Sequence, residues 1–138
     1  TLSLHDALPI SISVPEIAGI PVTHRDHASL VTFITGNERA DREEDRIDWE
    51  ALVGGHGTIV ILMGMANAPN ISRKLMGGGM PGNMPVAVIT EGSTARQRSA
   101  VSTLDDLAGM IEREGLKAPG IIVIGNVVKE RETLGDLS

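Results

Sequence analysis

Three short runs of apolar residues constrain the fold of this chain more than any other feature. They are TIVILMG at residues 58–64, MPVAVIT at residues 84–90 and GIIVIGNVV at residues 120–128. Each run is continuous rather than alternating, which is the pattern of a strand buried on both faces of a sheet. From this pattern we expect strands buried on both faces at residues 58–64 and 84–90, and a last strand at residues 120–128.

Helical patterns separate these strands. Residues 67–79 place Ile71 and Leu75 four positions apart, so that both lie on one helix face, and three glycines then end the helix. Residues 48–54 form a shorter predicted helix with Asp48 as its N-cap. Two weaker strands are predicted at residues 29–35 and 98–104, and a charged surface loop at residues 37–46.

Residues 102–115 read as an amphipathic helix that ends at Gly115. Ser102 or Thr103, followed three positions later by an acidic residue, predicts a start that resembles a capping box. The apolar side chains on its inner face are Leu104, Leu107, Ala108 and Ile111. Strands that alternate with helices indicate an α/β domain.

Composition excludes several classes of protein. The net charge of −6 argues against nucleic acid as a partner, and the lack of cysteine excludes disulfides and thiolate metal sites. No apolar run approaches the roughly 20 residues that a membrane-spanning helix needs. We therefore expect a soluble, cytoplasmic protein that binds neither nucleic acid nor membrane.

The first ten residues, TLSLHDALPI, fit neither a helical nor a strand period. They can be encoded by ACT CTT TCC CTA CAC GAC GCT CTT CCG ATC, which resembles a common sequencing adapter. We interpret residues 1–10 as a non-native scar, with a natural loop as the alternative, and exclude them from reasoning about the fold. His5 and Asp6 then leave every candidate site.

His24 and His27 lie three apart, as a metal-binding pair on a helix would, but no carboxylate at a known ligand spacing completes the set. We predict no metal site there. No nucleophile elbow of the form G-x-S-x-G supports a serine hydrolase. Arg25 follows the turn at Pro21 and suits bidentate carboxylate recognition, although from residue physics alone an ordinary surface arginine is the better explanation.

The ends of two predicted strands have the character of a ligand site. Ligands of open α/β sheets gather outside the carboxyl ends of strands. Gly64 and Gly92 would allow a ligand to approach the backbone, and Met63 and Met65 offer soft apolar contacts. Core methionines and an ordinary loop at residues 89–98 remain the alternative.

Four blocks taken together carry a resemblance to a known family. The blocks are AGIPVTHRDHAS, TIVILMGMAN, MPVAVITEGSTARQR and GIIVIGNVV. In this order and spacing they resemble the carboxyl-terminal half of the tetrapyrrole methylases, in particular the members that methylate uroporphyrinogen III. The resemblance covers residues 11–131 as one carboxyl-terminal domain and leaves residues 132–138 as a tail.

The resemblance implies a mixed sheet flanked by helices, and a parent enzyme of two α/β domains with S-adenosyl-L-methionine held between them. It implies methylation of uroporphyrinogen III at carbons 2 and 7 to give precorrin-2, for sirohaem and cobalamin biosynthesis, by a homodimer. Another precorrin methyltransferase, or a non-catalytic binding or dimerisation module, is the alternative.

The resemblance also implies site residues. The catalytic residues belong to the amino-terminal domain, so we expect this chain to be inactive alone. An arginine on the substrate side suits a macrocycle that carries eight carboxylates. The residues implied to contact the cofactor are Met63, Gly64, Gly92 and Ser93. Those implied to contact the substrate are Thr23, His24 and Arg25.

Overall fold

The computed structural model describes residues 14–15, 18–25, 27–36, 47–92 and 94–131. The predicted scar at residues 1–10, the predicted loop at residues 37–46, Ser93 and the tail at residues 132–138 lie outside this range. In the described part of the chain, no helix is long and apolar enough to cross a membrane.

The core of the molecule is one mixed five-stranded sheet with the order β1-β2-β5-β3-β4. β1 runs parallel to β2, and the other neighbouring pairs are antiparallel. The strands are β1 (Val31–Thr35), β2 (Thr58–Leu62), β3 (Pro85–Thr90), β4 (Arg98–Thr103) and β5 (Gly120–Ile124). The predicted α/β fold with a mixed sheet is therefore confirmed.

Helices connect the strands and cover the sheet. Among the described residues, the α-helices with defined bounds are α2 (Trp49–Gly54), α3 (Ala68–Gly77) and α4 (Leu107–Arg113). The 3₁₀ helices of the same residues are η1 (Met65–Asn67), η2 (Leu104–Asp106) and η3 (Asn126–Glu130).

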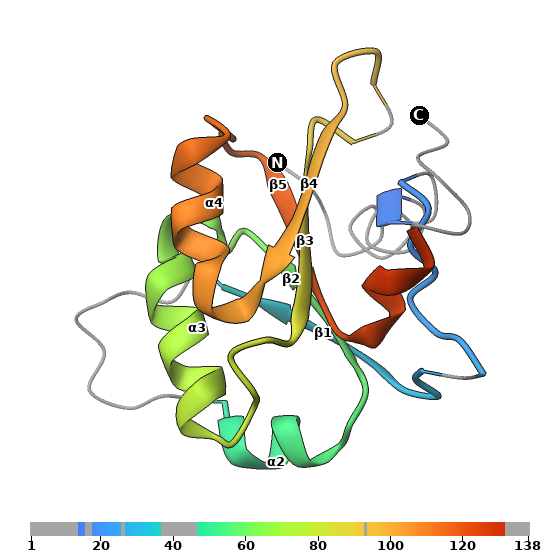
Figure 1. The fold of residues 1–138 in the computed structure, drawn as a ribbon, viewed down its shortest axis with the longest axis vertical. Coiled ribbons are helices and arrows are strands. Elements are labelled where there is room, and N and C mark those ends of the chain that lie inside the picture. Colours follow the sequence, from blue (N-terminus) through green and yellow to red (C-terminus); the bar gives the residue numbers. More distant parts are fainter. Residues whose placement is uncertain (1–13, 16–17, 26, 37–46, 93, 132–138) are drawn as a thin grey trace.

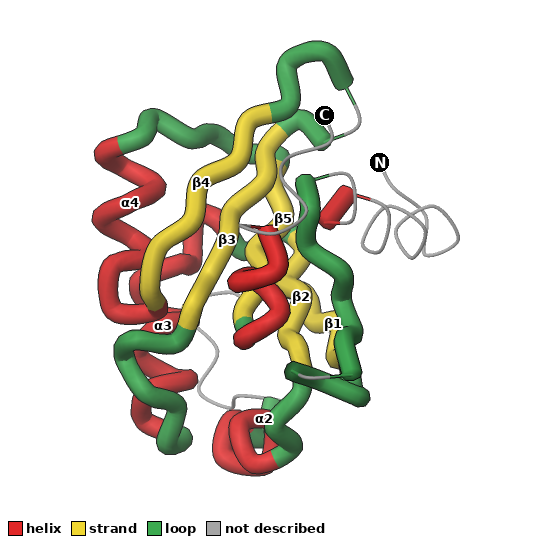
Figure 2. The backbone as a smooth tube through the Cα atoms, turned by 45° about the vertical axis from the view of Figure 1, so that its right-hand side comes forward, coloured by secondary structure: helices red, strands yellow, loops and turns green. Residues whose placement is uncertain are grey.

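Each face of the sheet has its own hydrophobic core. α3 and α4 cover one face, whereas η3 and the segment before β1 cover the other (Figures 1 and 2). Ile71, Leu75 and Leu107 are buried in the first core. Ile20 and Val127 are buried in the second. Because both faces of the sheet are covered by hydrophobic cores, the central strands carry apolar side chains at almost every position, which explains their continuous sequence pattern.

Two helix boundaries follow the sequence closely. The side chain of Asp48 accepts a hydrogen bond from the Ala51 backbone N–H at 3.0 Å and caps α2. At the end of α3, Gly78 donates its N–H to the Lys74 carbonyl, and Gly79 adopts φ +108°, a conformation that favours glycine. Both predicted boundaries are confirmed.

The predicted capping box at residues 102–106 is wrong. The Ser102 hydroxyl donates instead to the Asp106 carboxylate at 2.6 Å, and Arg113 donates to the same carboxylate at 2.8 Å. The hydrogen bond from Arg113, followed by that from Ser102, lowers the pKa of Asp106 below its ordinary value of 3.8. The 3₁₀ helix η2 precedes α4, so α4 begins at Leu107. The hydroxyls of Ser102 and Thr103 therefore bond to carboxylates rather than to the backbone N–H groups at the start of the helix.

The last predicted strand is also too long. β5 ends at Ile124, Gly125 adopts φ +148°, and residues 126–130 form η3. Val127 and Val128 are still buried, against the face of the sheet opposite α3. A short apolar run fits a strand and a buried helical turn equally well, which is why the pattern predicted the wrong element.

Candidate functional site

A large open cavity of about 1130 Å³ lies at one end of the sheet. It occupies the carboxyl ends of β2 and β3, and because β5 runs antiparallel to both, it also reaches the amino end of β5. The cavity is lined by Val14, Leu62, Met63, Met65, Ala66, Ile89, Glu91, Gly92, Thr94, Ala95, Arg96, Ala118, Pro119, Gly120 and Ile121.

Met63 follows β2 directly and has the backbone conformation φ +56°, although the sequence pattern predicted a strand there. A residue with a side chain pays roughly 1–2 kcal/mol to adopt this left-handed conformation. The Met63 side chain is 65% exposed, so burial does not offset that cost. Such strain is concentrated at functional sites, which makes Met63 a candidate functional residue of the cavity lining.

A turn after β3 forms a second wall. Glu91 also has a left-handed backbone, with φ +49°. The Thr94 hydroxyl donates to the Glu91 carbonyl at 2.6 Å and accepts from the Arg96 backbone N–H at 3.2 Å. These bonds fix a compact turn that presents one acidic and one basic residue to an otherwise apolar cavity.

The two predicted site glycines have packing roles. A Cβ on Gly92 would overlap the Val14 side chain, and a Cβ on Gly64 would lie 2.6 Å from Cγ2 of Ile61. Gly92 lines the cavity, but Gly64 is not among its lining residues. Ser93 lies outside the described residues. Contact of Gly64, Gly92 and Ser93 with a cofactor stays a prediction.

The three residues predicted to contact the substrate lie at the other end of the sheet. Arg25 lines a pocket of about 290 Å³ with His27, Ala28, Ser29, Leu30, Gly55 and His56. This pocket shares no lining residue with the large cavity and adjoins the amino ends of β1 and β2. A five-residue strand, about 13 Å long, separates the two ends of the sheet.

Thr23 and His24 belong to the same turn as Arg25. Paired backbone hydrogen bonds of 2.9 and 2.8 Å between His24 and Ala28 close this turn. Nε2 of His27 lies 2.9 Å from Oε1 of Glu130, and Nε2 of His24 lies 3.7 Å from Oε2 of the same residue. Sequence reasoning missed Glu130 because it lies 103 positions from His27.

A mixed sheet with a large, mainly apolar cavity at its strand ends is the arrangement in which open α/β domains commonly bind their ligands. Residues 5–108 match the family described as Tetrapyrrole (Corrin/Porphyrin) Methylases, and the chain belongs to this family. The match begins inside residues 1–10, the predicted non-native scar.

Curated relatives share much of the sequence. A Methanosarcina barkeri protein named S-adenosyl-L-methionine-dependent uroporphyrinogen III methyltransferase is 48% identical over 91% of this chain and 49% of its own length. The Bacillus subtilis uroporphyrinogen-III C-methyltransferase is 45% identical over 85% of this chain and 45% of its own length. A siroheme synthase from Methylobacillus flagellatus is 44% identical, with 26% of its length covered.

Solved structures have the same fold. A cobalt precorrin-4 methyltransferase superposes with a TM-score of 0.75 at 16% identity and covers 86% of this chain and 49% of its own. A uroporphyrin-III-C-methyltransferase from Thermus thermophilus superposes with a TM-score of 0.70 at 25% identity, covering 91% and 51%. The chain thus spans about half the length of the methyltransferases it matches.

Proposed function

We propose that this chain is the carboxyl-terminal half of a uroporphyrinogen-III C-methyltransferase, which methylates carbons 2 and 7 to give precorrin-2. The observation that carries the proposal is the 48% identity to a relative of that name, over 91% of this chain but only 49% of the relative. The missing half would supply the catalytic residues, so the chain alone is inactive. The complete enzyme would act as a homodimer.

The large cavity supports a role in holding S-adenosyl-L-methionine. Its lining is mainly apolar, which fits an adenine ring and the carbon chain beside the sulfonium, and Glu91 supplies a carboxylate that can accept hydrogen bonds. When bound, this co-substrate supplies a methyl group on a sulfonium centre. The role of this chain would be to orient the methyl donor. Met63 and Met65 would form a wall beside the sulfonium, and orientation of the reacting groups dominates the rate of such a displacement.

The proposed substrate contacts lie far from the cavity proposed to hold the co-substrate. Arg25 is exposed and lies about one strand length from the cavity. Thr23, His24 and Arg25 would therefore hold carboxylate arms of the macrocycle rather than its reacting carbons. A guanidinium there attracts a polyanionic substrate to a chain whose net charge is −6.

Complementation tests the proposal directly. The full chain is mixed with the amino-terminal half of the Bacillus subtilis relative, and mass spectrometry follows the gain of methyl groups by uroporphyrinogen III. The two halves of that relative provide the positive control. We expect no product from the chain alone and precorrin-2 from the mixture. Product from the chain alone would contradict the proposal that the other half of the enzyme supplies the catalytic residues.

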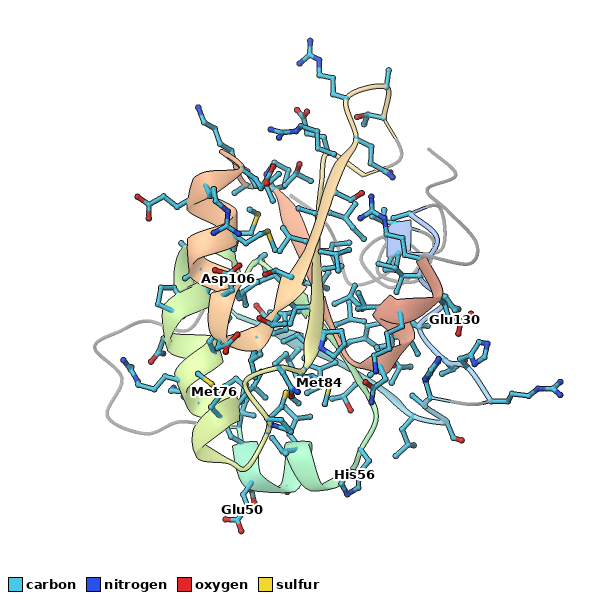
Figure 3. The ribbon with its side chains drawn as sticks, in the orientation of Figure 1. Glu50, His56, Met76, Met84, Asp106 and Glu130 are labelled. Atoms are coloured by element: carbon cyan, nitrogen blue, oxygen red, sulfur yellow. The ribbon has the colours of Figure 1, made fainter. Side chains whose placement is uncertain are left out.

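A mixture that stays inactive while the control works would refute the proposal. Methylation of a later precorrin, but not of uroporphyrinogen III, would identify a different methyltransferase. Met63→Ala should lower the rate of the mixture because it removes the cavity wall, whereas Met76→Ala, on the outer side of α3, should not (Figure 3).

A further inference from the structure

We propose that His24, His27 and Glu130 form a binding site for a divalent transition metal, with Zn²⁺ as the best fit. These are the side chains of the described residues whose nitrogen and carboxylate atoms converge, with every ligand atom within 4.8 Å of the others. Neither the family resemblance nor the proposed methyl transfer requires such a site.

The interatomic distances suit a tetrahedral ion. Zinc–nitrogen and zinc–oxygen bonds of about 2.0–2.1 Å place neighbouring tetrahedral ligands about 3.3 Å apart. The separations from the Glu130 carboxylate to the two imidazole Nε2 atoms are 2.9 Å for His27 and 3.7 Å for His24, on either side of that value. Small side-chain rotations would bring all three ligands onto one ion.

The backbone already supports this geometry. The hydrogen bonds between His24 and Ala28, with a further bond of 3.0 Å from His27 N–H to the His24 carbonyl, hold both histidines in one turn. Their ring centroids are 5.0 Å apart. Glu130 ends η3, which is anchored through buried Val127 and Val128. Both segments lie on the sheet face opposite α3 and α4 (Figures 1 and 3).

The chemistry of the ligands selects among metals. Two imidazoles and one carboxylate favour Zn²⁺ and its neighbours over Mg²⁺ or Ca²⁺, which prefer oxygen ligands. The three side chains are only 20–27% exposed, which limits but does not prevent access to solvent. Three protein ligands leave a fourth position for water. A bound ion would tie the turn at His24 to η3, and so join distant parts of the chain.

Calorimetry of the full chain with ZnCl₂ tests the site, and the absorption of added Co²⁺ reports its geometry. We expect one ion per chain, bound at micromolar concentration or tighter, with the spectrum of four-coordinate cobalt. His24→Ala, His27→Ala and Glu130→Gln should each weaken binding at least ~100-fold, beyond the roughly 10–100-fold that outer-shell partners cost. No substrate or methyl donor is present, so the result is independent of the proposed enzyme activity.

His56→Ala and His5→Ala are the matched controls, because they are the other two histidines of the chain. Both variants should bind Zn²⁺ like the parent. His56 lines the same small pocket as His27, but it is not among the converging ligands, and Figure 3 labels it away from Glu130. Zn²⁺ should also raise the unfolding temperature of the parent but not of His27→Ala, whose fold is checked by circular dichroism. Failure of the parent to bind, or equal loss in the controls, would overturn the proposal.

Discussion

The two ends of the sheet differ in how their candidate sites are built. The large cavity consists mostly of residues at or just beyond the end of a strand, such as Met63, Gly92 and Gly120. The cluster at the opposite end joins His24 and His27 to Glu130, more than 100 positions away. A site at strand ends follows from strand order and direction, whereas a cluster of this second kind depends on the packing of the whole chain.

The largest loss of stability should come from a change in β5, because this strand connects the two ends of the sheet. β5 begins at the cavity and leads into η3, which carries Glu130. Ile122→Ala empties a fully buried position in the centre of the sheet and should cost about 2–5 kcal/mol of unfolding free energy. Urea unfolding measures the loss. Ligand binding at both ends should weaken together, and loss at one end alone would mean that the two sites are structurally independent.

Gly92→Ala tests the cavity end separately. The added methyl group would overlap Val14, so we expect a loss of about 1–3 kcal/mol. Gly77→Ala is the matched control, because no atom lies within 4 Å of its added Cβ. That variant should be neutral or more stable by up to about 1 kcal/mol. Thermal unfolding of the two variants compares them, and equal effects would contradict the packing role of Gly92.

Met63→Gly should stabilise the protein by about 1 kcal/mol, because glycine adopts φ +56° without strain. The same change should weaken binding of S-adenosylhomocysteine by the complemented enzyme, since the cavity loses a side chain. Chemical unfolding and calorimetry measure the two effects. A variant that is less stable than the parent would show that Met63 contributes more by packing than it loses by strain.

The smallest effect is expected at Asp106. Its partners Ser102 and Arg113 lie within seven positions of it, whereas Glu130 lies 103 positions from His27. Because its folded pKa is lowered, Asp106 stabilises the fold above its ordinary pKa of 3.8, and this contribution disappears as pH falls through the lower folded value. Asp106→Asn should therefore be less stable than the parent at neutral pH and equal to it in strong acid. A difference that is constant with pH would exclude the charge as its cause.

The central strands and helices could be predicted because their patterns are local. The continuous apolar runs predicted β2 and β3 to within two residues, and the spacing of Ile71 and Leu75 predicted α3. The run at residues 120–128 was predicted too long because burial of Val127 and Val128 does not distinguish a strand from a helical turn. Strand direction is not encoded in such runs.

The lining of the large cavity could be predicted only in part, because part of it depends on strand direction and on packing between distant segments. Met63 lies at the end of the predicted strand at residues 58–64, and Met65 and the turn after β3 follow predicted strands, so their placement at the cavity could be anticipated. Pro119 and Gly120 reach it because β5 is antiparallel, and Val14 reaches it by packing against Gly92. A Cβ added at Gly64 would meet Ile61 and Ile71, which gives this glycine a packing role, and the approach of a ligand to its backbone stays a prediction.

The order of the strands has a practical consequence for anyone who handles this protein. In the described part of the chain, β4 pairs with β3 alone, so one side of its backbone has no partner strand. Arg98 is the only charge on β4, and Val101 is 47% exposed at its centre. An open edge with so little charge is a template for strand addition, so concentrated samples are expected to self-associate there. Val101→Lys places a charge at the centre of this edge and is expected to reduce the self-association.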